Sequence, residues 1–476
     1  MIDRIPDRIP KSVLIGAALL APVFLIYVAY SQPEYFNSQV YLGGLVFLEF
    51  LFCAIWMYRQ VFFPVVLMAF LFSGTGLPGG WTAARWAVLA IGALVGCAIL
   101  AKDRRLSFGL FHGIALFAII AALLSAAVSK YPGFALLKAL SVLLLFVYAG
   151  TGARLAVAGR EQRFFAGLLT GCELFVAGLA LCYLVGREVM GNPNSLGVVM
   201  GVVGAPILLW GTMVAETSPV RVRRFAILAI CLYMVYYSHA RASMGAAALS
   251  CGLLCIALRR YKLLGQGVLV IIILVSAVAV LNPVAFSDKA YDVFSSVVYK
   301  NPDQTRSFLA SRESPWQSAQ ATIRNHFWFG TGFGTTDNGQ DASARLNEFS
   351  TTPEVSAENG SSYLAIFAWV GMLGVLPFFL LLLAIMGKVI RTVLWMVNTG
   401  SPFHPAIPVA MVMIAALFHA GFEDWLFAPG YYVCVFFWSL AFILVDVAPR
   451  TPLPGISSSV RRPWLRHVLG ETVPGR

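Results

Sequence analysis

The sequence predicts an all-α, polytopic membrane protein, and its composition carries that prediction. Of the 476 residues, 59% are hydrophobic and 12% are charged, whereas a soluble domain is about 45–50% apolar and about 25% charged. The mean hydropathy is +0.79. Since one bilayer crossing takes roughly 20 residues, the apolar residues suffice for about 14 crossings. This composition excludes a soluble globular enzyme, a disordered chain and a nucleic-acid-binding module.

The apolar runs are continuous and lack the alternation of barrel strands, so the crossings must be helices. The first run follows Arg4, Arg8 and Lys11 as in a signal peptide. It is nearly a full span without a small-residue cleavage site, and we interpret it as a retained helix. The predicted spans are 12–30, 40–58, 61–77, 85–101, 107–128, 134–149, 164–184, 195–214, 225–240, 243–258, 266–281, 361–386, 404–421 and 430–446.

Basic residues orient these helices, because Lys and Arg are retained in cytoplasmic loops. With a cytoplasmic N-terminus, the inner segments and both termini hold 23 of the 34 Lys and Arg residues. The short outer connections hold five, and six lie in one long loop, a type of loop that escapes the bias. We therefore predict that both termini are cytoplasmic. Topology explains the net charge of +12 better than nucleic-acid binding does.

One polar stretch of 79 residues, 282–360, interrupts the helices and faces outward in this topology. A loop of this length inside a compact protein is usually functional. The chain thus divides into helices 1 to 11 (1–281), the outer loop (282–360), helices 12 to 14 (361–446) and a basic cytoplasmic tail (447–476).

The outer loop contains two amphipathic pieces, 287–300 and 314–327. In the second piece we expect Ser314 to cap a helix and Pro315 to occupy its first position. We expect both pieces to lie on the bundle or the membrane surface as a lid. The apolar stripe predicted for the second piece consists of Trp316, Ala319, Ile323 and Phe327.

Outward-facing arginines are the first candidates for a substrate site. Arg241 lies in the short turn 238–243 between two spans, Arg312 lies in the outer loop, and Arg187 precedes Glu188. A guanidinium group presents a planar fork of donors that suits phosphate oxygens. The alternatives are a structural ion pair, for which Glu188 is available to Arg187, or a snorkelling side chain.

Glu358 is the best-placed carboxylate for acid–base chemistry, because it directly precedes the span that begins at 361. A general base needs a pKa raised toward the working pH. The helix dipole acts in the opposite direction, so Glu358 serves as a base only where burial or a bound phosphate offsets it. The alternative is a carboxylate that simply stabilises the helix start.

Other motifs favour simpler roles. The glycine-rich run 329–336 has no preceding strand and no following Gly-Lys-Ser/Thr, so we predict a tight turn that folds the loop onto the bundle. Glu423 and Asp424, in the last outer turn, either contact a sugar or mark the water interface. Glu49 and Glu173 fall mid-span, where charge is a functional clue, although a buried pair or a protonated carboxyl is equally plausible.

We expect no metal site, cofactor or disulfide framework. His239, His326 and His419 are widely separated, and the sequence has no Asp-x-Asp pair. The eight cysteines lie in apolar runs and show no Cys-x-x-Cys spacing.

The motifs together resemble those of the O-antigen ligase and Wzy-type polysaccharide polymerase superfamily of bacterial envelope proteins. The resemblance rests on Gly191 to Gly197 before a span, the turn 238–243, the run from Arg312 to Gly334, and Glu358 to Leu364 followed by Gly371 to Gly374. Each motif alone is weak, but their order around the outward loop is specific.

The resemblance implies a metal-independent glycosyltransferase of the multi-helix type in the bacterial inner membrane, with its active site facing the periplasm. The donor would be an oligosaccharide on undecaprenyl diphosphate, its diphosphate held by Arg241 and Arg312, with Arg187 as a further candidate. Glu358 would be catalytic. The candidate sugar-binding residues are Asn359, Glu423, Asp424 and Trp316.

The implied partners are a glycan acceptor, the lipid bilayer and other polysaccharide export proteins, without nucleic acid. Ligases commonly carry His-Asn where this chain has Glu358-Asn359, which favours an exopolysaccharide or capsule polymerase that inverts the anomeric carbon. The alternatives are a ligase that transfers glycan to lipid A-core and a transporter or flippase for a lipid-linked sugar or small anion. The transporter would rely on Glu49 and Glu173, but the sequence lacks the matching repeat halves that many transporters show. A non-catalytic envelope scaffold is a third.

Overall fold

The computed structural model describes most of the helical bundle, and all regular structure in the described residues is helical. This confirms the predicted all-α class. The described residues are 57–74, 81–102, 106–190, 192–267, 310–335 and 359–449, with the isolated positions Tyr27, Ser31, Leu269 and Ser276.

Several predictions from the sequence fall outside these residues and remain predictions. They are the span 12–30, nearly all of 40–58 and 266–281, the amphipathic piece 287–300, and the carboxylates Glu49 and Glu358.

The described helices follow the predicted spans closely. Six helical segments are long and apolar enough to cross a membrane, and four shorter apolar helices accompany them in the described part. The count of about 14 crossings remains a prediction. The helices are α4 (Tyr58–Ser73), α5 (Trp81–Lys102), α6 (Leu110–Ala127), α7 (Pro132–Tyr148), α8 (Arg154–Val157), α9 (Glu161–Leu184), α10 (Pro193–Val198), α11 (Ala205–Met213), α12 (Ser218–Tyr237), α13 (Arg241–Ala257), α16 (Ala310–Asn325), α18 (Ser362–Thr399), α19 (Ala406–His419) and α20 (Tyr432–Val447).

Two π-helical segments keep the chain helical between shorter pieces. Segment η1 (Ala149–Ala153) joins α7 to α8, and η2 (Val199–Gly204) joins α10 to α11. The first makes one continuous helical span of Pro132–Val157, longer than the predicted 134–149. The second makes the most buried span in the described part, Pro193–Met213, which therefore lies at the centre of the bundle.

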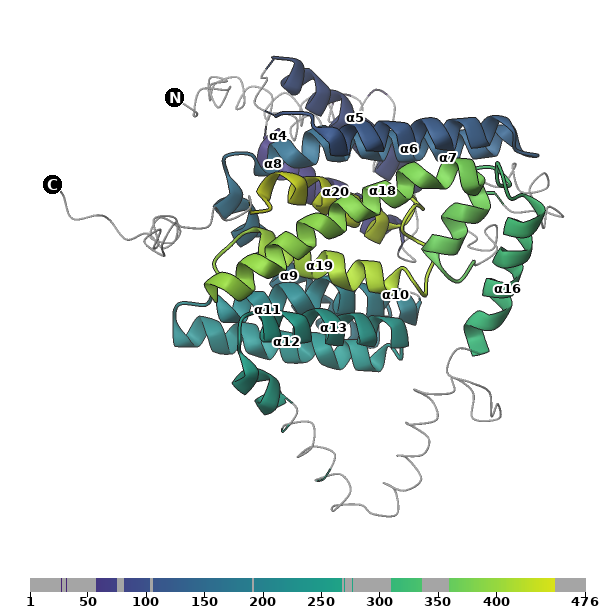
Figure 1. The fold of residues 1–476 in the computed structure, drawn as a ribbon. Helices are drawn as coiled ribbons and strands as arrows, with labels where there is room; N and C mark the ends of the chain where they lie inside the picture. The colour runs from purple at the N-terminus through teal and green to yellow at the C-terminus, as the bar shows by residue number, and fades with distance from the viewer. Residues whose placement is uncertain are drawn as a thin grey trace.

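The helices lie side by side, and their ends define two opposite ends of the bundle (Figure 1). At one end, Arg59 of α4 donates to the carbonyl oxygen of Leu155 at 3.1 Å, beside the start of α9. At the other, Arg85 of α5 donates to Ser73 Oγ at 3.0 Å and to the carbonyl oxygen of Gly430 at 2.8 Å. We call these the basic end and the loop end, since α16 lies at the second.

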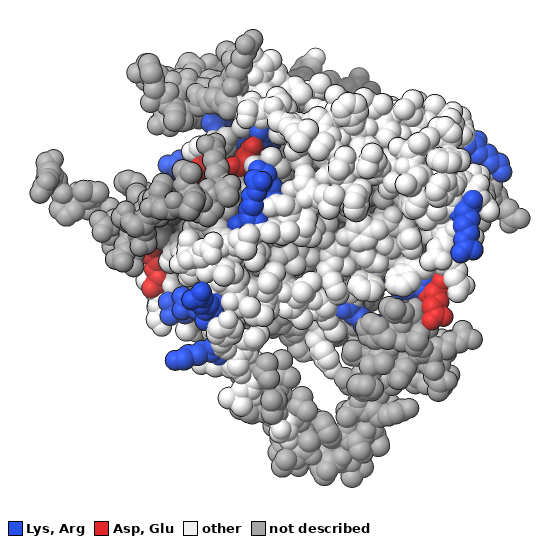
Figure 2. All heavy atoms as spheres, in the orientation of Figure 1, with Lys and Arg blue, Asp and Glu red and all other residues white. Residues whose placement is uncertain are grey.

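The two ends differ in charge. Figure 2 shows that charged side chains gather toward both ends and leave a wide, mostly uncharged band between them, as expected for a membrane-facing surface. The loop end holds seven of the 20 described Lys and Arg residues: Arg85, Lys130, Lys138, Arg187, Arg241, Arg312 and Arg324. The basic end holds the other 13: Arg59, Lys102, Arg154, Arg160, Arg163, Arg221, Arg223, Arg224, Arg259, Arg260, Lys262, Lys388 and Arg391.

Arg154 corrects the sequence prediction, which placed it in an inner loop. The π segment η1 carries the helix past the predicted end of the span, and Arg154 is only 2% exposed. Its Nε and Nη2 atoms donate to the two carboxylate oxygens of Asp446 at 2.6 and 2.8 Å. Its Nη1 lies 2.8 Å from His112 Nε2. The bidentate contact with Asp446 joins α8 to α20, and the contact with His112 joins α8 to α6.

Glu173, mid-span in α9, forms a buried ion pair, which was one of the alternatives predicted for it. It is 5% exposed, and its two carboxylate oxygens contact Arg224 Nε at 2.8 Å and Arg223 Nη2 at 2.9 Å. Two arginines from α12 thus compensate the charge of Glu173. A carboxylate without such partners would be costly in the middle of a membrane span.

Helix α18 begins where the predicted span 361–386 begins, but it does not end at 386. It continues to Thr399, where Gly400 terminates it in the left-handed conformation with φ 62°. The predicted end was wrong because charged residues such as Lys388 and Arg391 do not stop a helix that reaches water. Near its start, α18 is broken at Gly371, which has φ 65° and ψ −175°.

The contacts of Arg154 generate a prediction about stability. Arg154→Ala leaves Asp446 and His112 without their shared partner, and we expect a loss of about 3 kcal/mol in unfolding free energy, the low end for a broken buried pair because Asp446 is partly exposed. Thermal unfolding of the detergent-purified protein measures this. Arg391→Ala, an exposed change at the same end, is the control. An equal melting temperature for both variants would contradict the role of Arg154.

Candidate active site at the loop end

The break in α18 exposes main-chain groups that hold the glycine-rich run of the outer loop. Helical hydrogen bonding is interrupted at Gly371, so nearby carbonyl oxygens accept from outside the helix. Thr331 N donates to the carbonyl oxygen of Ala368 at 3.0 Å, and Gly332 N to that of Trp369 at 3.1 Å. In return, Met372 N donates to the carbonyl oxygen of Phe327 at 2.7 Å.

These bonds confirm the predicted tight turn in the glycine-rich run. Gly330, Gly332 and Gly334 have φ values of 71°, 107° and 72°, conformations that favour glycine. Lys138 of α7 donates from Nζ to the carbonyl oxygen of Gly334 at 2.8 Å. The turn is therefore attached to both α7 and α18, and it fixes the C-terminal side of α16.

Helix α16 begins at Ala310, earlier than predicted. Ser314 therefore does not cap it, and Pro315 lies inside the helix rather than at its first position. The missing N–H of Pro315 removes only one hydrogen bond close to the helix start, so the helix tolerates it.

The packed face of α16 agrees with most of the predicted stripe. Ala319 is 1% exposed, and Trp316 is partly buried and donates from Nε1 to the carbonyl oxygen of Gly360 at 3.0 Å. Phe327 lies past the end of the helix and is 41% exposed, so its place in the stripe was wrong. Through Trp316, α16 is joined to the segment that leads into α18.

Arg312, on the inner face of α16, forms an ion pair with Glu423, and both side chains are largely buried. Burial and, to a lesser extent, the positive charge of Arg312 lower the pKa of Arg241, the first residue of α13. Two of the predicted phosphate-binding arginines therefore converge from α13 and α16. The charge of Arg312 also reaches His419, which accepts a hydrogen bond from Trp425 Nε1 at 2.9 Å.

Asp424 holds the segment before α18. Its Oδ2 accepts from the main-chain N–H of Asn359 at 2.9 Å, and the Asn359 side-chain amide lies 3.5 Å from the same oxygen. Next to this contact, Ser362 Oγ donates to the carbonyl oxygen of Glu423 at 2.6 Å and accepts from Leu426 N at 3.1 Å. The turn between α19 and α20 and the start of α18 are therefore one rigid unit.

A hydroxyl cluster lies beside this unit. Tyr431 OH lies 3.3 Å from Ser195 Oγ and 3.4 Å from Tyr432 OH, and Tyr432 OH donates to the carbonyl oxygen of Ser195 at 3.0 Å. Asn192 caps α10 by accepting from Asn194 N at 2.8 Å, which places Ser195 in the first turn of that helix. The charge of Glu423 acts on Tyr431, so the cluster lies near the arginines.

The structure brings together most of the residues predicted from the sequence. Arg187 lies in the exposed turn after α9, and no ion pair joins it to another described residue. Glu358 lies outside the described residues. The residues that converge are Arg241, Arg312, Trp316, Asn359, Glu423 and Asp424.

Sequence reasoning missed Lys138, His419 and the Ser195–Tyr431 contact. Lys138 is the single basic residue of the span 134–149, which was an available signal, and the charge of Asp424 acts on it. Ser195 lies within the motif Gly191 to Gly197 that the family resemblance used. Tyr431 gave no signal, because nothing local to it in the sequence indicates a partner more than 200 residues away.

No group of three His, Cys, Asp or Glu side chains that suits a metal ion occurs within the described residues. The seven described cysteines are free thiols.

The fold and this cluster define an all-α membrane protein with a polar, arginine-containing site at one end of its bundle. Residues 226–379, about a third of the chain, match the family model described as O-antigen ligase. The match includes Arg241, Arg312 and the break at Gly371. It confirms the resemblance to the O-antigen ligase and Wzy-type superfamily and supports glycosyl transfer of the ligase or polymerase kind. No curated protein matches the chain.

The loop contacts at Gly371 generate a second prediction. A Cβ atom there would lie 2.5 Å from the carbonyl atoms of Trp328, and the positive φ adds a further cost of about 1–2 kcal/mol. We expect Gly371→Ala to release the turn 326–335 from α18 and to increase proteolysis in that segment. Gly387→Ala, on the same helix with open space around its Cβ position, should remain as resistant as the parent. Equal resistance of both variants would show that the turn does not depend on Gly371.

Proposed function

We propose that the protein is a membrane glycosyltransferase that polymerises undecaprenyl-diphosphate-linked oligosaccharide repeat units on the outer face of the bacterial inner membrane. The observation that supports it best is the convergence of Arg241 and Arg312 beside Glu423 and the Asn359 segment. These residues come from separate elements within one buried unit at the loop end.

The charge difference between the two ends supports a periplasmic site. Cytoplasmic segments retain Lys and Arg, and the basic end holds 13 of the 20 described basic residues. The loop end then faces the periplasm, where nucleotide sugars are absent. A donor activated on a lipid is therefore the substrate class that fits this location.

The arginines suit the diphosphate of such a donor. A diphosphate offers several oxygens to guanidinium forks, so it can replace Glu423 as the partner of Arg312 when the donor binds. The ion pair with Glu423 keeps Arg312 ordered before that exchange. During transfer the leaving diphosphate gains negative charge, which fixed arginines stabilise without reorganisation. Arg187 remains a further candidate for the same role.

Glu358 is the proposed general base. It directly precedes Asn359, which Asp424 holds through its main-chain N–H at 2.9 Å. A bound diphosphate would raise the pKa of Glu358, as a base requires. The acceptor hydroxyl would lose its proton to Glu358 and attack the anomeric carbon opposite the diphosphate, so the configuration inverts. Asn359, Asp424, Glu423 and Trp316 would line the sugar site.

Helix α16 and the turn 326–335 would exclude water from this site. A diphosphate-activated sugar hydrolyses wherever water reaches it, so excluding water protects the donor. Helix α16, held through Trp316 and the turn 326–335, would exclude water on the side of the outer loop.

A ligase that transfers glycan to lipid A-core is the alternative, and it would use the same donor site with another acceptor. Glu358-Asn359, in place of the His-Asn common in ligases, favours the polymerase. A transporter is less well supported, because Glu173 is engaged by Arg223 and Arg224. Purified protein supplied with a polyprenyl-diphosphate-linked repeat unit tests the proposal: longer glycans and free polyprenyl diphosphate support it, and translocation without a new glycosidic bond contradicts it.

The role of Glu358 gives a third prediction. Glu358→Gln should reduce chain growth by about 10²–10⁴-fold, the usual contribution of a general base, while protein abundance and melting temperature stay unchanged. Polymer on a gel and initial rates with the purified variant measure this. Normal polymer would remove Glu358 from the mechanism.

The arginines give a fourth prediction. Arg241→Ala and Arg312→Ala should each lower the rate by about 10²–10³-fold, as expected when a charge-stabilising group is lost. Lys at either position should restore only part of it, because an ammonium group lacks the planar fork. Arg324→Ala, an exposed change on the same helix as Arg312, is the control. Full activity of both alanine variants would contradict diphosphate binding.

A further inference from the structure

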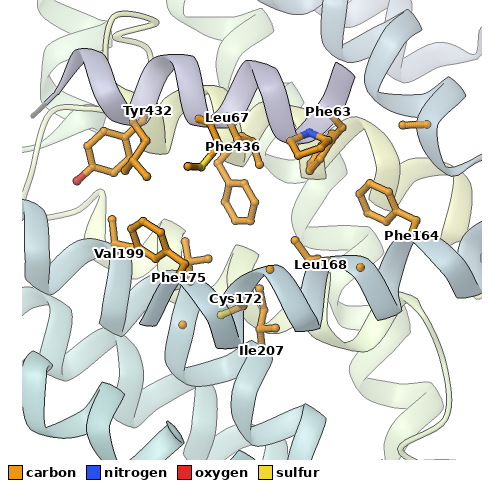
Figure 3. A pocket seen from close by; sticks show the side chains of 18 of the residues that line it. Phe63, Leu67, Phe164, Leu168, Cys172, Phe175, Val199, Ile207, Tyr432 and Phe436 are labelled. Atoms are coloured by element: carbon orange, nitrogen blue, oxygen red, sulfur yellow. The ribbon is translucent and has the colours of Figure 1, made fainter. Parts of the chain in front are cut away.

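An apolar groove runs between α4 and α9, from the basic end toward Tyr432, with η2, α11 and α20 at its back. It encloses about 400 Å³. Figure 3 shows Phe63 of α4 facing Leu168 and Phe175 of α9 across the open space, with Phe436 of α20 between them. The groove is open on one side, and the described side chains leave this volume unfilled.

Glycines of α9 make the groove wide. Gly167 and Gly171 lie one helical turn apart and line it, and a Cβ atom at either position would meet no other atom within 4 Å. A larger side chain would therefore occupy the groove without disturbing its walls. The wall that α9 presents to the groove is therefore flat at these two positions.

The described charged residues that line the groove are all positive and all lie at the basic end. They are Arg59, Arg160 and Arg163, and no Asp or Glu is among the described lining residues. Arg59 is held by the carbonyl oxygens of Leu155 and Ala158. Arg160 is partly buried, Arg163 is exposed, and neither forms an ion pair with a described residue. An apolar groove with a cationic opening matches the chemistry of an anionic lipid.

We propose that this groove binds an anionic glycerophospholipid of the leaflet at the basic end. Its phosphate lies against the guanidinium groups of Arg160 and Arg163, and one acyl chain extends along α4 and α9 toward Phe436. Basic pockets between membrane helices bind anionic headgroups in this way. The arginines at the opening of the groove lie at the end of the bundle opposite Arg241 and Arg312. A glycosyl donor whose diphosphate binds Arg241 and Arg312 would therefore not place a phosphate at this opening.

The lipid would reach one wall of the active-site unit. Tyr432 lines the groove, and the same side chain donates to the carbonyl oxygen of Ser195 and contacts Tyr431. An acyl chain packed against Phe436 and Tyr432 therefore supports α20 where it begins. The lipid acts as a structural ligand that stabilises the hydroxyl cluster.

Native mass spectrometry of the detergent-purified full chain tests this with phosphatidylglycerol and phosphatidylcholine as probes. The parent should retain phosphatidylglycerol in preference to phosphatidylcholine. Arg160→Gln and Arg163→Gln should each weaken phosphatidylglycerol retention about fivefold and leave phosphatidylcholine unchanged, because each removes one charge at the headgroup. Gly171→Leu should abolish retention of both. Gly178→Leu, on the same helix and outside the groove with equally open space, is the control and should behave as the parent.

Three results would overturn the proposal. One is equal retention of the two lipids by the parent, which indicates ordinary annular lipid. Another is unchanged phosphatidylglycerol retention in Gly171→Leu when its melting temperature equals that of Gly178→Leu. The third is displacement of phosphatidylglycerol by a polyprenyl phosphate whose own retention is lost in Gly171→Leu, which would assign the groove to the donor. None of these readouts uses glycosyl transfer, so they are independent of the proposed function.

Discussion

A charge inside a membrane-spanning bundle must be paired or must reach water, and this constraint organises the protein. Arg154 is buried against Asp446, and Glu173 is buried against Arg223 and Arg224. Each pair joins helices that are distant in the sequence. Because a buried charge is costly without its partner, each pair favours the arrangement in which these helices are neighbours. The remaining charges lie toward the two ends, and the uncharged band between them faces the lipid (Figure 2).

The same constraint gives the loop end its chemistry. Arg241 and Arg312 repel each other there, and Glu423 compensates part of the positive charge. Two partly buried arginines in one site suit the polyanionic ligand that we propose. The rigid turn between α19 and α20 supplies Glu423 and Asp424 together, so one element both neutralises Arg312 and positions the segment that follows Glu358.

The break in α18 connects the outer loop to this unit. An unbroken helix would have used its own carbonyl groups, whereas Gly371 leaves those of Ala368 and Trp369 available to the turn 326–335. The turn 326–335 is therefore held by main-chain hydrogen bonds to α18, with Lys138 and Ser129 adding side-chain hydrogen bonds to it. Trp316 adds one contact from α16.

Local sequence patterns predicted the helices, the glycine turn and most of the α16 stripe, because periodicity and φ preferences act over a few residues. They did not predict the burial of Arg154, since a π segment kept the helix going where a loop was expected. They also did not predict the pairings of Arg312 with Glu423 or of Asn359 with Asp424. Those contacts span 111 and 65 residues and depend on how the helices pack.

Orientation in the membrane is the claim on which the proposed chemistry depends most directly. A reporter fused near residue 337, compared with one fused near residue 262, measures it. In the proposed orientation, alkaline phosphatase is active only at the first position and a cytosolic fluorescent reporter only at the second. A cytosolic location for residue 337 would place the arginines beside the wrong pool of substrates and would contradict the assigned roles of Arg241, Arg312 and Glu358 together.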